Sequence, residues 1–110
     1  MSGFDDREKG FEAKYRLDQE TQFRVTARRN KLLGQWAAGK MGLTGDAVET
    51  YAREVVAADF QKPGDADVIE KVLQDLTARK ITSTEAEIRK QLDTLAATAR
   101  EQVLAESGKA

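Results

Sequence analysis

The stretch QETQFRVTARRNKLLGQWAAGKM, residues 19–41, decides the fold because its apolar residues recur at the spacing of an amphipathic helix. Plotted at about 100° per residue, they share one arc, and basic residues occupy the opposite arc. The apolar arc holds Phe23, Val25, Leu32, Leu33, Trp36, Ala37 and Met41, and the basic arc holds Arg24, Arg28 and Lys31. Gly42 ends the pattern, as glycine often does at the C-terminal end of a helix.

Two further expectations concern this helix. Trp36 is the chain's single tryptophan, and we predict that it anchors the core. Its ring would face the apolar stripe of the last helix, formed by Ile88, Leu92 and Leu95. Arg29 and Asn30 project near the flanks of the apolar arc, where an unpartnered polar group is unfavourable, so we expect both to make hydrogen bonds.

Three more helical segments follow, each bounded by residues that start or stop helices. We predict them over residues 46–61, 66–79 and 83–106. Pro63 disfavours helix at the residue before it and so separates the first two segments. The carboxylate of Asp65 is expected to cap the second, and Thr82 with Glu85 has the spacing of a capping box at the start of the third.

These patterns predict an all-α protein. Four amphipathic helices joined by short turns should pack as a four-helix bundle over residues 19–107, with 108–110 as a short tail. A chain of 110 residues can build one such core but not two. No apolar run is long enough for a transmembrane helix, so we expect a soluble, cytoplasmic protein.

The composition argues against an enzyme. The chain has no cysteine and no histidine, which removes thiolate chemistry, zinc-thiolate sites and the usual proton shuttle at neutral pH. Its paired acids lie at predicted helix starts, where carboxylates serve as caps. The glycines at 34, 39, 42 and 45 match no phosphate-binding loop, and no strand precedes them. We therefore expect no catalytic residue, no metal and no cofactor.

Residues 1–18 carry three of the seven aromatic residues but lack the aliphatic residues that build a core. On a helix, Phe4, Phe11 and Tyr15 would share one face, because their spacings are seven and four. Aromatic anchors at such spacings are typical of a helix that binds in a groove of another protein. The segment is therefore a candidate for partner binding. The alternative is an N-terminal tail that is disordered and has no role.

Several blocks together resemble one protein family. They are FDDREKGFEAKYRLDQETQF (4–23), ARRNKLLGQWAA (27–38), GLTGDA (42–47), VVAADFQKPGDADV (55–68) and AREQV (99–103). In their order and spacing they resemble the ζ-type inhibitor subunit of the F-type ATP synthase of α-proteobacteria. The resemblance implies a four-helix bundle preceded by a segment that is mobile in the free protein and becomes helical on the synthase.

The resemblance also implies a function and its residues. The protein would stop ATP hydrolysis by inserting residues 1–18 at a catalytic α/β interface, against the central rotor stalk. Phe4, Phe11 and Tyr15 would be the apolar anchors, and Asp5, Asp6, Arg7, Glu8, Glu12 and Lys14 would pair with polar groups of the cleft. The protein would bind peripherally to the membrane-bound synthase, without inserting into the membrane or binding nucleic acid. Gly10 departs from the family pattern and would weaken the inserted helix.

A different class of function stays open from the residues alone. Five bases and one acid between residues 19 and 42 give this segment a charge of +4, although the whole chain carries −1. The face formed by Arg24, Arg28 and Lys31 could bind nucleic acid or an acidic protein. The chain would then be a helical scaffold, and residues 1–18 would be a disordered tail. Weak nucleotide binding by the bundle is not tested by the sequence.

Overall fold

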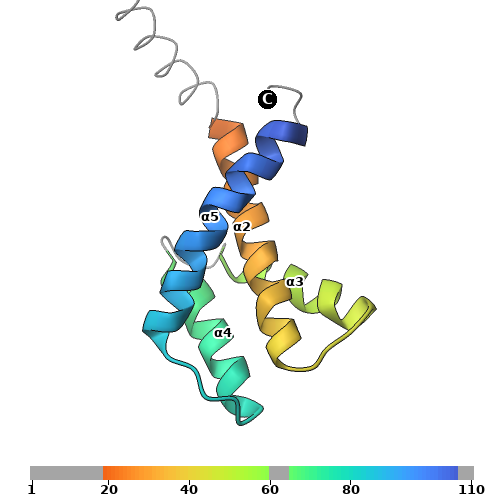
Figure 1. The fold of residues 1–110 in the computed structure, drawn as a ribbon, viewed down its shortest axis with the longest axis vertical. Coiled ribbons are helices and arrows are strands. Elements are labelled where there is room, and N and C mark those ends of the chain that lie inside the picture. Colours follow the sequence, from red (N-terminus) through yellow and green to blue (C-terminus); the bar gives the residue numbers. More distant parts are fainter. Residues whose placement is uncertain (1–18, 60–64, 107–110) are drawn as a thin grey trace, which may run out of the picture.

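The computed structural model describes residues 19–59 and 65–106, and it is built entirely from helices within these ranges. They are α2 (Gln19–Lys40), α3 (Asp46–Ala58), α4 (Ala66–Ala78) and α5 (Glu85–Glu106). The two long helices α2 and α5 run antiparallel and cross, and α3 and α4 pack against their lower halves (Figure 1). This confirms the predicted all-α, four-helix fold for the described part of the chain.

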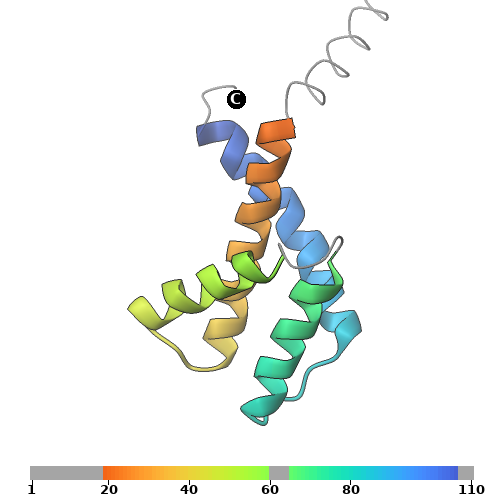
Figure 2. The same cartoon turned by 180° about the vertical axis from the view of Figure 1, so that it is seen from behind.

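The two halves of the molecule differ in thickness. Seen from behind, α3 lies against the lower half of α2, and α4 lies beside the start of α5 (Figure 2). The beginning of α2 and the end of α5 instead pair mainly with each other. This two-helix part has a small cluster of its own, formed by Val25, Ala99 and Val103 with Leu32 packed against it.

The start of α5 differs from the predicted one. The helix begins at Glu85, not at residue 83, because Thr84 is its N-terminal cap. The hydroxyl of Thr84 accepts a hydrogen bond from the backbone N–H of Glu87 at 3.1 Å, and the Ser83 hydroxyl donates to the Glu87 carboxylate at 2.7 Å. The capping residues are therefore Thr84 and Glu87, two positions after the predicted pair with the same spacing.

The main core lies between the lower parts of all four helices. Its fully buried side chains include Leu33, Val55, Val68, Val72, Leu76 and Ile88. Trp36 was predicted to anchor this core; it packs against the core cluster, but it is only partly buried. The ammonium of Lys40 lies 4.9 Å from the ring centroid, so the outer part of the indole faces a cation and solvent. Leu33 takes the central position on α2.

Gly34 allows α2 and α3 to approach closely. A Cβ atom built at Gly34 would lie 2.6 Å from the Cα atom of Ala52 and 3.2 Å from a methyl carbon of Val55. The first contact is with backbone, which cannot rotate away as a side chain can. Any residue larger than glycine at this position must therefore push the two helices apart.

We expect Gly34→Ala to lower the free energy of unfolding by about 1 to 3 kcal/mol, because overpacking outweighs the gain in helix propensity. Gly39→Ala is the matched control, since Gly39 lies on the same helix and its Cβ would meet nothing within 4 Å. That change should leave stability unchanged or raise it by up to ~1 kcal/mol. Urea unfolding of the two variants checks this; equal stabilities would contradict a close contact at Gly34.

Candidate interaction surface

All nine residues predicted to bind a partner lie outside the described ranges. They are Phe4, Asp5, Asp6, Arg7, Glu8, Phe11, Glu12, Lys14 and Tyr15. The structure therefore does not test their arrangement. It does place the residue that follows their segment: Gln19 begins α2, at the end of the molecule where the last turns of α5 also lie (Figure 1). Any partner held by residues 1–18 is thus next to this end of the bundle.

The basic face of α2 is partly engaged within the protein. The guanidinium of Arg28 donates hydrogen bonds to Gln102 at 2.9 Å and to Glu106 at 2.7 Å, which ties α2 to the last turns of α5. The bond from Arg28, with the nearby charges of Arg24 and Lys31, lowers the pKa of the Glu106 carboxyl. This pairing is therefore present at neutral pH and is lost as the pH falls through that lowered value.

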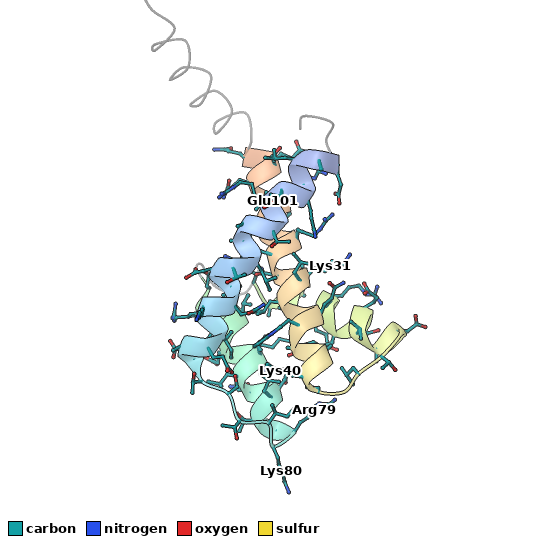
Figure 3. The ribbon with its side chains drawn as sticks, viewed as in Figure 1. Lys31, Lys40, Arg79, Lys80 and Glu101 are labelled. Carbon is teal, nitrogen blue, oxygen red and sulfur yellow. The ribbon has the colours of Figure 1, made fainter. Side chains whose placement is uncertain are left out.

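Other basic side chains of the protein are spread along its length and do not gather on one face. Figure 3 shows Lys31 partway along α2, whereas Lys40, Arg79 and Lys80 lie near the opposite end from Gln19. A surface for nucleic acid requires several cations on one face to match successive phosphates. With Arg28 bonded to α5, the face formed by Arg24, Arg28 and Lys31 offers a weaker site than the sequence suggested.

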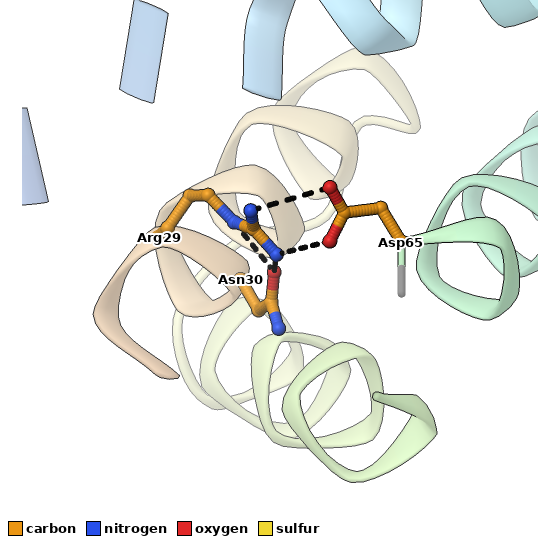
Figure 4. Close-up of polar contacts among 3 residues, drawn as sticks. All are labelled: Arg29, Asn30 and Asp65. Atoms are coloured by element: carbon orange, nitrogen blue, oxygen red, sulfur yellow. Dashed lines mark hydrogen bonds and ion pairs between the residues drawn. The ribbon is translucent and has the colours of Figure 1, made fainter. Parts of the chain in front are cut away.

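A polar cluster of Arg29, Asn30 and Asp65 joins α2 to the start of α4 (Figure 4). Arg29 donates from Nη2 to Asp65 Oδ1 at 2.8 Å and from Nη1 to Oδ2 at 3.5 Å. Its Nε and Nη2 also donate to Asn30 Oδ1, at 3.1 and 3.0 Å. The expectation that Arg29 and Asn30 make hydrogen bonds is confirmed.

Asp65 has a different role from the predicted one. It occupies the N-cap position of α4, but its carboxylate makes no capping hydrogen bond. Both of its oxygens accept from Arg29 instead. A bidentate, charged guanidinium is a stronger hydrogen-bond donor to a carboxylate than a single backbone amide. This explains why Asp65 binds Arg29 and does not cap α4.

A second polar cluster, which the sequence reading missed, links α3 to α4. The Tyr51 hydroxyl donates to Asp75 at 2.8 Å, and the Lys71 ammonium donates to Asp75 at 3.0 Å and to Glu54 at 3.3 Å. Burial, followed by the bond to Asp75, raises the pKa of Tyr51 further above its ordinary value. The phenol stays protonated at neutral pH, so this cluster joins two helices and does not exchange protons.

Phe23 was predicted on the apolar arc, but its side chain does not enter the core. It is 56% exposed and borders a hollow of about 190 Å³ between α2 and α3. We call this the Asn30 hollow; it is lined by Gln19, Gln22, Phe23, Thr26, Ala27, Asn30, Val56 and Asp59. Periodicity alone could not reveal it, because the hollow exists only where α3 crosses α2.

Residues 19–59 and 65–106 contain neither a cluster typical of a metal site nor a helix typical of a membrane span. No three residues among Asp, Glu, His and Cys in these ranges come together as a metal site would require. None of the described helices is long and apolar enough to cross a membrane.

We expect Arg29→Ala to destabilise the protein more than Asp65→Ala. Removing Asp65 takes away one partly exposed ion pair and should cost about 1 kcal/mol. Removing Arg29 also leaves the buried Asn30 oxygen without a donor and should cost about 2 to 4 kcal/mol. Arg89→Ala, which removes an exposed pair with Glu85, is the control and should cost less than ~1 kcal/mol. Chemical denaturation of the three variants measures this order, and a reversal would contradict the central place of Arg29.

Comparisons with known proteins identify relatives over most of the chain. A family model described as ATPase inhibitor subunit zeta matches residues 1–102. A protein whose structure was solved in solution by NMR is 46% identical, with a TM-score of 0.69. The alignment covers 77% of this chain and 96% of that one. No curated protein matches the chain.

Proposed function

Because the chain belongs to the ATPase inhibitor subunit zeta family, we propose that it inhibits ATP hydrolysis by an F-type ATP synthase. In this proposal, residues 1–18 form a helix that inserts at a catalytic α/β interface and lies against the central rotor. The observation that carries it is the extent of the family match, which runs from residue 1 to residue 102. The segment before the bundle is therefore part of the family's shared sequence.

The physical basis of the proposed inhibition is differential binding. A catalytic interface that opens and closes during rotation has several conformations, and a helix that fits only one of them stabilises that one. Phe4, Phe11 and Tyr15 would supply most of the binding energy through buried aromatic area. The charged residues around them would pair with polar groups of the interface and fix the orientation of the helix.

The proposal assigns the bundle a supporting role and no catalysis. The composition offers no histidine or cysteine, so the inhibitor acts by occupying a site and not by a chemical step. The protein would work in the cytoplasm, bound at the surface of the membrane-embedded synthase. Its partners would be the α and β subunits and the central stalk, without nucleic acid. The hydrogen bonds from Arg28 to α5 give no support to the nucleic-acid alternative.

The first test of the proposal removes residues 1–18. The truncated protein should no longer inhibit ATP hydrolysis by the cognate synthase, because the inserted segment is absent. Its thermal unfolding should be nearly unchanged, since the buried residues of the described bundle lie in α2 to α5. Hydrolysis assays and calorimetry on the same preparation measure both. Full inhibition by the truncated protein would move the active surface to the bundle.

The second test changes the proposed anchors within the full chain. Phe11→Ala combined with Tyr15→Ala should weaken binding by several kcal/mol, because a buried aromatic anchor contributes about 2 to 4 kcal/mol. Gly10→Ala should act in the opposite direction. It lowers the cost of forming the helix by up to ~1 kcal/mol, about fivefold in the half-inhibitory concentration. Titrations of ATP hydrolysis compare the variants, and an unchanged value for the double variant would rule out these rings as anchors.

A further inference from the structure

The apolar stripe of α5 is divided between two separate clusters. Ile88 and Leu92, in the first half of the helix, belong to the main core with residues of α2, α3 and α4. Ala99 and Val103, in the second half, belong to the smaller cluster with Val25 of α2. One continuous helix thus depends on two clusters that share no buried residue. Because stability is not uniform across a fold, the two halves of α5 can open separately.

The smaller cluster holds its part of α5 less strongly than the main core does. Its buried residues are two valines and one alanine, whereas the main core buries several leucines and isoleucines as well. Stabilisation by burial rises with the apolar area removed from water, so the smaller cluster contributes less. Among the described residues α3 makes no contact with α5, and α4 lies beside the start of α5 (Figure 2). The last turns of α5 therefore depend on α2.

Arg28 supplies the polar part of this contact. It lies on the same side of α2 as Val25 and Leu32, three residues after the first and four before the second. Its guanidinium donates to Gln102 at 2.9 Å and to Glu106 at 2.7 Å, one turn apart on α5. The Glu106 side chain is 47% exposed, so solvent screens the ion pair. Such a bond adds to the contact without making it as stable as the main core.

We propose that residues 96–106, the last three turns of α5, form a latch that Arg28 holds closed and that opens as a unit while the main core stays folded. The latch begins after Leu95, the last residue of α5 that packs against the main core. Opening uncovers Val25 and Leu32 and frees the Arg28 guanidinium. The open state thus presents an apolar and basic face on the first turns of α2. Opening is a property of the free protein and does not depend on the proposed function.

Amide hydrogen exchange of the full chain, followed by NMR at neutral pH, measures this opening. The backbone amides of Ala99 and Val103 should be protected roughly tenfold less, or lower still, than those of Leu76 and Leu92. Both should report one opening equilibrium, because the latch opens as a unit. Protection of Ala99 and Val103 equal to that of Leu76 would overturn the inference. A steady rise in exchange from Ala99 to Val103 would also overturn it, since that pattern marks simple fraying of a helix end.

A core variant separates the latch from the rest of α5. Ile88→Val removes a methylene group from a fully buried residue in the first half of the helix, which stays packed when the latch opens. It should speed exchange at Leu76 and Leu92 about two- to tenfold, through lower global stability, and leave Ala99 and Val103 unchanged. Equal acceleration at all four amides would show that α5 unfolds in one piece, which would reject the latch.

A second variant acts on the latch itself. Arg28→Ala removes both hydrogen bonds to α5, so exchange at Ala99 and Val103 should become about two- to fivefold faster. Arg89→Ala is the matched control, because it removes an exposed ion pair in the first half of the same helix and should leave both amides unchanged. Unchanged exchange at Ala99 and Val103 in Arg28→Ala would contradict the inference that Arg28 holds the latch closed.

Discussion

The contact between Gly34 on α2 and Ala52 on α3 is the constraint on which the rest of the packing depends. Because glycine has no side chain, the two helices approach until backbone meets backbone, and Leu33 and Val55 beside the crossing are fully buried. The same crossing also builds the surface of the protein. One to two turns from Gly34 on α2, Asn30 and Ala27 line the Asn30 hollow together with Val56 of α3 and Asp59, the residue that follows α3.

Polar side chains then hold the shorter helices in place. Arg29 reaches from α2 to Asp65 at the start of α4, and Tyr51 reaches from α3 to Asp75 farther along it. Such partly buried bonds contribute little net stability, but leaving one partner alone is costly, so they penalise other arrangements of the helices. The first of these bonds has a second effect. By occupying the Asn30 oxygen, Arg29 fixes the orientation of this buried amide, which connects the packing of α4 with a buried polar group of α2.

The bundle and residues 1–18 have different roles in the proposed function. The described helices bury their apolar residues against one another, so they fold without a partner's surface. Residues 1–18 lack the aliphatic residues that build a core. In the proposed function, their aromatic side chains are buried against the synthase instead. The exposed ring of Phe23 lies between these two parts of the chain, on the bundle but close to the segment.

The sequence by itself determined the helices, their order and the family. Periodicity and capping residues are properties of single segments, so α2 to α5 could be predicted with errors only at their ends. The positions of Arg29 and Asn30 near the flanks of the apolar arc of α2 also predicted that both need hydrogen-bond partners. The tertiary structure alone decided that Leu33 and not Trp36 occupies the centre, that Phe23 remains exposed, and that Asp65 binds Arg29 instead of capping α4. The physical reason is that an apolar arc is wider than the face a neighbouring helix covers. Which of its residues are buried depends on where the other helix crosses, and that crossing is set by contacts such as Gly34 with Ala52, between residues far apart in the chain.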